Sequence, residues 1–336
     1  MRRAVIALVA CTHSAARVVA PPSLTVHGWP AGWVAPELVD TPPFVPPPAT
    51  SFSLANGVRV IVVENHRLPV VAFELVAGAA GSREDGDKHG LAALTADLLD
   101  KGEPVTDRLD ELGATLDVHI APDYASIGMT ALSDKLGAAA TLLATVVRAP
   151  RFEELEVERG REMRIAELAR DRDQATTECA QLFDRVVFGE HPYAHTSEGE
   201  PVAVARLVPA DVRVFWKRAY GPTTTTIVVA GDVTRAGLEA ALAAAFGDWA
   251  NVTPEPPRTP LVAGPSARQL AYVDRPGAGT ATIMIGRRSF AGGDARNLAA
   301  DVVDAVLGAS QSSRLVLRLR DELGYTHGVG AGFWRG

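Results

Sequence analysis

The chain has 336 residues, a length that corresponds to one large domain or two ordinary ones. Its net charge of -7 argues against a nucleic-acid-binding protein, because such proteins need a basic surface to neutralise phosphates. Two cysteines cannot build a disulfide framework, and no apolar run approaches the roughly 20 residues of a membrane-spanning helix. Composition therefore indicates a globular α/β or α+β protein, and its function must come from motifs.

The N-terminus has the pattern of an export signal over residues 1–20. A basic Met1-Arg2-Arg3 precedes an apolar run from Ala4 to Ala10, and Cys11 follows. Residues 8–11 (LVAC) are similar to the lipobox of bacterial lipoproteins, which predicts a lipid anchor at Cys11 and a periplasmic or membrane-anchored protein. A second possible cleavage site follows Ala20. The alternative is an unstructured N-terminus with a chance cysteine.

Residues 21–48 contain nine prolines. This density excludes helix and central strand and favours an extended tether. An extended arm lying on the following domain is the alternative.

Residues 49–250 are expected to form a complete domain. The Asn56-Gly57 pair predicts a hairpin within residues 51–64, and a strand follows at 69–78. Apolar spacing and composition predict the remaining elements. These are strands within 114–130 and at 224–230, and helices at 90–101, 105–112, 133–147, 153–171, 176–188, 200–219 and 235–249.

A proline-rich linker at residues 251–266 separates this domain from the remainder. Strands are expected at 269–275 and 281–286, and a helix at 295–307. The order repeats that of residues 70–102, which suggests an incomplete second copy of the domain over residues 267–336. Segregated strands and helices favour the α+β class over a doubly wound parallel sheet.

Several strings resemble the M16 metallopeptidases, the family of pitrilysin, insulin-degrading enzyme and the mitochondrial processing peptidase. The resembling strings are NGVRVIVVE, HGLAALTADLLDKGE, RAPRFEELEVERGREMRIAEL, FGEHPYAHTSEGEP, FWKRAYGPTTTTIVVAGDV and SSRLVLRLRDELGYTHGVGAGF. The resemblance implies the LuxS/MPP-like fold, in which helices cover one face of a β-sheet. It also implies that two such domains form half of a clamshell around a peptide chamber.

Active members of that family carry an inverted zinc motif, HxxEH, on the helix that corresponds to residues 90–101. Here its three functional positions are Ala93, Ala96 and Asp97, so both imidazoles and the catalytic carboxylate are replaced. The position of the third zinc ligand is Glu167, which could equally be an ordinary surface residue. A displaced site using His89 is excluded by distance, because eight helical residues separate it from Asp97 by about 12 Å. We therefore expect no zinc.

The resemblance also implies a substrate-binding Arg and Tyr, seven residues apart, in the second domain. Arg320 matches the first position, and His327 stands where the Tyr is expected. Tyr325 would share a face with His327 if the segment were a strand. The alternative is that Arg320 is a surface residue at the end of a helix.

Three functions follow from this pattern. The first is a non-catalytic M16 subunit that forms a peptide-binding chamber with a separate, HxxEH-bearing homologue. The second is a structural or peptide-binding homologue without a peptidase role, and the third is a zinc-dependent endopeptidase with unrecognised ligands. About 70 residues follow the linker, so either the chain is truncated or a partner completes the second domain.

Overall fold

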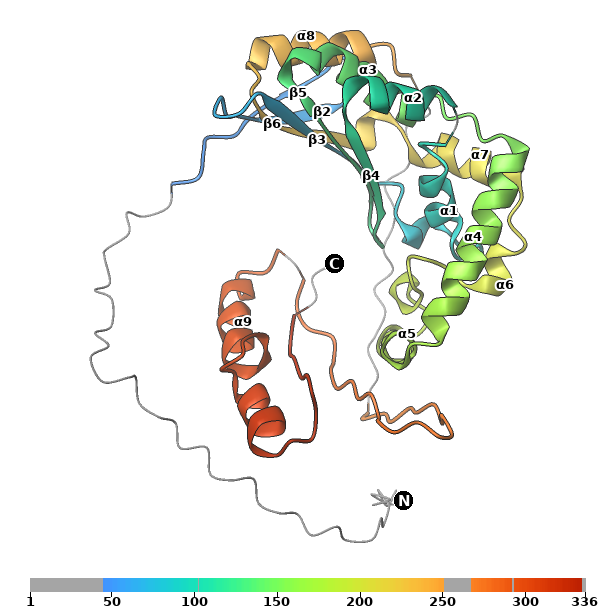
Figure 1. Ribbon diagram of the computed structural model, residues 1–336, viewed down its shortest axis with the longest axis vertical. Helices are drawn as coiled ribbons and strands as arrows, with labels where there is room; N and C mark the ends of the chain where they lie inside the picture. The colour runs from blue at the N-terminus through green and yellow to red at the C-terminus, as the bar shows by residue number, and fades with distance from the viewer. Residues whose placement is uncertain (1–44, 102, 251–266, 292, 334–336) are drawn as a thin grey trace. The chain divides into compact units, whose positions relative to one another are not determined.

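The computed structural model describes residues 45–101, 103–250, 267–291 and 293–333 (Figure 1). The chain divides between Pro46 and Pro47 into two units, the first of which lies almost wholly outside the described residues. The predicted export signal, the tether up to residue 44, the anchor at Cys11 and the linker at 251–266 also lie outside them.

A six-stranded mixed sheet forms the centre of the second unit (Figure 1). Its strand order is β1-β2-β6-β3-β5-β4, with β2 and β6 parallel and the other neighbours antiparallel. The strands are β1 (Thr50–Ser53), β2 (Arg59–Glu64), β3 (Val70–Ala77), β4 (Thr115–Ile120), β5 (Ala125–Leu132) and β6 (Thr225–Gly231). A single parallel pair within an otherwise antiparallel sheet confirms the α+β class.

The predicted hairpin is confirmed, with β1 and β2 antiparallel around Asn56-Gly57. Gly57 has a φ of 98°, a conformation that side chains of L-residues rarely adopt. The Asn56 side chain donates a hydrogen bond to the Phe246 carbonyl at 2.7 Å, which ties the turn to the end of a helix far along the chain.

Helices cover one face of the sheet, as Figure 1 shows for α3 and α8. Their bounds are α1 (Leu91–Asp97), α2 (Glu103–Leu112), α3 (Leu136–Arg148), α4 (Glu154–Arg172), α5 (Ala175–Phe188), α6 (Pro201–Val204), α7 (Pro209–Ala219) and α8 (Arg235–Phe246). Alternation along β3 buries Val71, Phe73 and Leu75 beneath the helices, while Ala72 and Glu74 face the other way. One face of the sheet is therefore core, and the opposite face is open.

Two predicted helices differ from the structure. The helix expected over 90–101 ends at Asp97, and the one expected over 200–219 is divided into α6 and α7. Pro209 begins α7, because proline lacks the N–H that a continuous helix would need there.

The strands predicted at 269–275 and 281–286 are wrong: residues 267–291 and 293–333 contain no strand. They contain helix α9 (Asn297–Asp304) and two π-helical segments, Ala305–Ala309 and Val316–Glu322. Alternating apolar residues cannot form a ladder without a neighbouring strand to bond to. Their side chains remain exposed instead, with Leu270 at 87% and Ile285 at 95%. The interpretation of this region as an incomplete second copy stays a prediction.

Among the described helices, none combines the length and the apolar character that crossing a bilayer requires.

Replacing Leu143 by alanine tests the packing of the helix layer. Leu143 on α3 is completely buried in the core, so Leu143→Ala should lower the free energy of unfolding by about 2–5 kcal/mol in urea titrations. Leu132→Ala is the matched control, because Leu132 is 48% exposed and should cost much less. Equal losses at the two positions would contradict the assigned core.

Candidate functional site

Helix α1, which carries the degenerate motif, begins at a buried carboxylate. The two Asp85 oxygens accept hydrogen bonds from the backbone N–H groups of Gly90 at 2.8 Å and Ala92 at 2.7 Å. N–H groups at a helix start have no partner within the helix, so Asp85 satisfies them. Burial raises the pKa of Asp85 to about 7, although these backbone hydrogen bonds oppose the shift.

A pair of glycines brings the start of α1 against the segment at 196–200. Gly90 and Gly199 have φ angles of 102° and 95°. A Cβ on Gly199 would lie 2.4 Å from the Gly90 Cα, so the two backbones approach at a distance that only glycine permits. This contact places the backbone of Glu198, the residue before Gly199, against the start of α1.

The first two positions of the degenerate motif belong to the core. Ala93 and Ala96 are 1% and 2% exposed, so their methyl groups fill space against neighbouring apolar side chains. Apolar packing thus takes the place of one His ligand and of the catalytic Glu that the family resemblance implies at these two positions.

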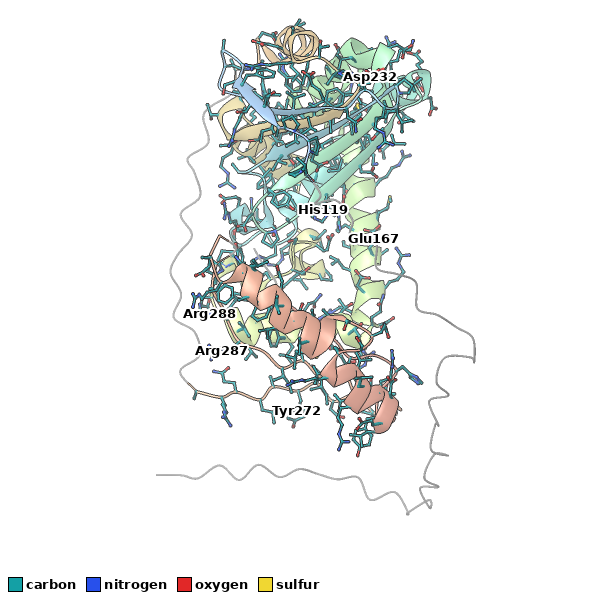
Figure 2. The ribbon with its side chains drawn as sticks, turned by 90° about the vertical axis from the view of Figure 1, so that its left-hand side faces the viewer. His119, Glu167, Asp232, Tyr272, Arg287 and Arg288 are labelled. Atoms are coloured by element: carbon teal, nitrogen blue, oxygen red, sulfur yellow. The ribbon has the colours of Figure 1, made fainter. Side chains whose placement is uncertain are left out.

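The guanidinium of Arg164 lies between Asp97 and Glu167, the two other positions where the family resemblance implies a zinc ligand. Arg164 on α4 donates hydrogen bonds to the carboxylates of Asp97 on α1 and Glu198. Its Nη1 is also 3.9 Å from an oxygen of Glu167, one turn further along α4. Figure 2 labels Glu167 on this helix. We call these four residues the Arg164 cluster. The side chain of Arg164 is 9% exposed, and those of its three acidic partners are 42–46% exposed.

Burial and charge pairing act in opposite directions within the Arg164 cluster. Burial raises the pKa of Asp97, and the adjacent Arg164 reduces this shift without cancelling it. One cation faces three carboxylates, so the cluster keeps an excess of negative charge. It borders a cavity of about 420 Å³ that is lined mainly by polar side chains of α4.

Sequence models of two M16 domains match this chain. The model described as insulinase (peptidase family M16) matches residues 59–190, and the one described as peptidase M16 inactive domain matches residues 206–334. The chain belongs to the M16 peptidase family. The predicted family and fold are confirmed.

Curated M16 relatives are bacterial proteins of similar sequence. An uncharacterized zinc protease of Mycobacterium tuberculosis is 27% identical over 82% of this chain and 65% of its own length. A non-peptidase homolog of Helicobacter pylori is 22% identical over 52% of this chain and 42% of its own length. The chain therefore spans about 65% of the mycobacterial relative's length.

Among solved structures, the peptidase M16 inactive domain from Pseudomonas fluorescens is 25% identical, with a TM-score of 0.75. The match covers 86% of this chain and 71% of that one. A protease from Helicobacter pylori matches with a TM-score of 0.74 at 18% identity, over 86% of this chain and 72% of that one, which shows the shared fold alone.

The zinc site of active M16 members does not fit the residues present here. Zinc needs nitrogen, sulfur or carboxylate ligands with free lone pairs, and the Asp97 carboxylate is already bonded to Arg164. Ala93 and Ala96 supply no ligand atom. His89, which was considered for a displaced site, stacks on His195 with ring centroids 3.7 Å apart. Within the described ranges, no group of three or more His, Cys, Asp or Glu residues could hold a metal ion.

The predicted substrate-binding pair lies in and after the π-helical segment 316–322. Arg320 bonds to Asp321 at 2.7 Å and to Gln311 at 2.5 Å. His327 is exposed, and residues 324–333 form no strand, so the predicted shared face with Tyr325 is not formed. The assigned roles of Arg320 and His327 stay predictions.

Sequence reasoning missed three residues of this site: Arg164, Glu198 and Asp85. Arg164 is one of several arginines on a charged helix, and nothing in the sequence distinguishes it. Glu198 follows 34 residues later in a loop. Asp85 precedes α1 by more residues than an ordinary capping residue does, so no capping pattern reveals it.

Removing the Arg164 charge should destabilise the fold. Arg164→Met leaves three carboxylates without their cation, and we expect a loss of about 1–3 kcal/mol in urea unfolding, less than for a fully buried pair because the carboxylates are partly hydrated. Arg159→Met on the same helix breaks an exposed pair with Glu156 and should cost under about 0.5 kcal/mol. A loss at Arg164 no greater than at Arg159 would refute the cluster's structural role.

Asp85 should make stability depend on pH. Its folded pKa of about 7 exceeds the usual 3.8, so the folded state binds the proton more tightly between those values. The stability contribution is full below about pH 4 and is lost as pH rises towards 7, with a slope of at most about 1.4 kcal/mol per pH unit. Thermal or urea unfolding of Asp85→Asn should lack this component. Superimposable pH profiles for the two proteins would show that Asp85 does not titrate as described.

Proposed function

We propose that this chain is a non-catalytic M16 subunit that forms part of a peptide-binding chamber, with a separate zinc-bearing homologue supplying the catalytic site. The observation that carries the proposal is the Arg164 cluster. The Arg164 guanidinium is bonded to Asp97 and Glu198 and also lies near Glu167. Asp97 and Glu167 stand at two of the three zinc-ligand positions that the resemblance implies. A chain built in this way stabilises its own carboxylates without a metal, and peptide hydrolysis then requires another subunit.

The region after the linker supports the need for a partner. Side chains with the alternation of a strand, including Tyr272 at 83% and Ile283 at 77% exposed, lack a covering layer in the described residues. Exposed apolar residues of this density mark surfaces that bind other protein. A homologue that supplies neighbouring strands would bury them.

The proposal includes an exported location, supported by the sequence pattern of residues 1–20 alone. Cys11 would be the lipid attachment site, and the peptide substrate would be encountered outside the cytoplasm.

A peptide-binding homologue without any peptidase role is the second candidate. It is favoured by His327, which stands where the family resemblance implies a tyrosine, and by the likeness to a non-peptidase homolog. The two candidates differ in whether a zinc-bearing partner gains activity from this chain.

Mixing experiments separate the two candidates. The chain and an HxxEH-bearing M16 homologue encoded beside it would be assayed with fluorogenic peptides, each alone and together. Activity should rise only in the mixture, and Arg320→Ala should reduce it by about 10- to 100-fold, the loss that corresponds to a charge-assisted hydrogen bond.

Arg318→Ala provides the matched control, because Arg318 lies in the same segment and pairs with Glu322 at the surface. That variant should retain the activity of the mixture. A mixture no more active than the homologue alone would reject the subunit proposal, and an unchanged Arg320→Ala mixture would reject the role of Arg320.

A further inference from the structure

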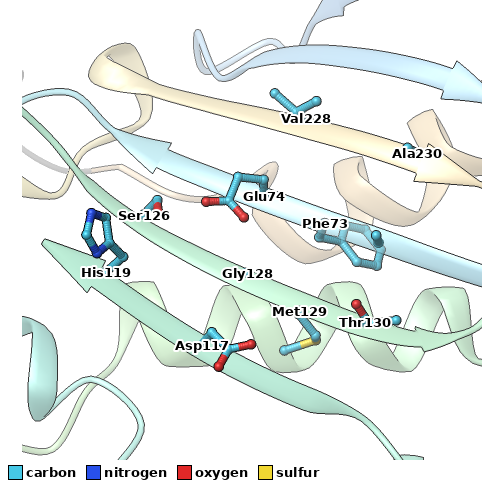
Figure 3. Close-up of a pocket in the computed structure, with 11 residues that line it drawn as sticks. Phe73, Glu74, Asp117, His119, Ser126, Gly128, Met129, Thr130, Val228 and Ala230 are labelled. Carbon is cyan, nitrogen blue, oxygen red and sulfur yellow. The ribbon is translucent and has the colours of Figure 1, made fainter. Parts of the chain in front are cut away.

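On the open face of the sheet, two acidic residues flank a glycine across three neighbouring strands. Strand register places Asp117 on β4 beside Gly128 on β5, and Gly128 beside Glu74 on β3. Adjacent strands lie about 4.8 Å apart, so the backbones of the two acidic residues are about 10 Å apart, and their side chains approach each other over a glycine. Figure 3 shows the two carboxylates on either side of Gly128.

Because Gly128 has no side chain, the space between the two acidic residues is open and forms part of a cavity. A Cβ at this position would lie 3.1 Å from a Glu74 carboxylate oxygen and 4.0 Å from the Asp117 Cβ. Any larger side chain would occupy the space between the two acids. The cavity measures about 350 Å³ and is open to solvent.

Among the described residues that line the cavity there is no Lys or Arg, and His119 is the one titratable side chain besides the two acids. Both acidic residues are exposed, and neither Glu74 nor Asp117 forms an ion pair or a side-chain hydrogen bond with another described residue. Two uncompensated carboxylates at this separation attract a cation that can approach both.

A mostly buried serine in the cavity wall is a second, independent feature. Ser126 lies on the next open-face row of β5, lines the cavity and is 6% exposed. Its hydroxyl forms no hydrogen bond with any other described residue and faces the cavity, where a ligand can reach it. A ligand that brings N–H donors would satisfy this oxygen and both carboxylates together.

We infer that this cavity, between Glu74 and Asp117 and above Gly128, binds the lysine or arginine side chain of a peptide. An ammonium or guanidinium group carries positive charge and several N–H donors, which matches two carboxylates and a hydroxyl. The inference rests on the proposed peptide-binding function and adds to it a preference for basic substrates. A metal ion is a poorer fit, because no ligand set of three His, Cys, Asp or Glu residues is present in the described part of the chain.

Peptide binding to the full chain tests the inference directly. Fluorescence anisotropy would compare labelled peptides that are identical except for a central lysine, arginine or alanine. The basic peptides should bind at least tenfold more tightly than the alanine peptide, and added NaCl should reduce the difference. Equal affinities, or no binding of the basic peptides, would overturn the inference.

Variants locate the binding. The Glu74→Gln/Asp117→Asn double variant should remove the preference for basic peptides while leaving the alanine peptide unaffected. Gly128→Val should also remove it, because that variant keeps both charges and fills the gap. Glu239→Gln is the control: Glu239 is an exposed acid on α8, which covers the opposite face, and the preference should persist. A preference that survives the double variant and Gly128→Val would place the site elsewhere and overturn the inference.

The outcome is separable from that of the proposed function. A mixture with the homologue that shows no peptidase activity rejects the subunit proposal, yet lysine-dependent binding that is lost in the double variant still supports this site. Activity in the mixture with no preference for basic peptides rejects the site and leaves the subunit proposal intact.

Discussion

The ion pairs of the Arg164 guanidinium are the interactions on which the candidate site at α1 depends. The guanidinium connects α1 through Asp97, the segment before α6 through Glu198, and its own helix through Glu167. A zinc ion would connect comparable elements in an active relative by drawing in ligands of negative charge. Here the Arg164 side chain supplies positive charge next to these carboxylates.

The remaining features of α1 are consistent with that replacement. Once no metal has to be held, Ala93 and Ala96 can pack as core residues. The helix start is still fixed, because Asp85 bonds its first N–H groups and Gly90 lies against Gly199. The geometry of the helix is therefore maintained by capping and close packing, while alanines stand at two of the three motif positions.

Sequence patterns predicted those elements whose formation depends on residues that are neighbours in the sequence. The Asn56-Gly57 turn, the alternation in β3 and the amphipathic helices all depend on neighbouring residues, and each is found in the structure. The strands expected at 269–275 and 281–286 are not formed, because a strand needs a partner as well as an alternating sequence. The Arg164 cluster could not be anticipated, since Glu198 reaches Arg164 only through the fold. The same holds for the cavity at Gly128, where three strands must be in register before two acids flank a glycine.

The two faces of the sheet differ in what covers them and in the charge they carry. The face beneath α3 and α8 is apolar and closed, and it carries the stability of the domain. The open face carries unpaired charge and a missing side chain, which contribute nothing to packing. The proposed function would use this division, with the covered face keeping the sheet rigid and the open face binding peptide.

Calorimetric titration of the metal-free full chain with zinc tests the central claim most directly. If Arg164 serves in place of the metal, micromolar zinc should produce no saturable binding, and Asp97→Asn should behave like the unaltered protein. One equivalent of zinc bound at micromolar affinity, and lost in Asp97→Asn, would contradict the account.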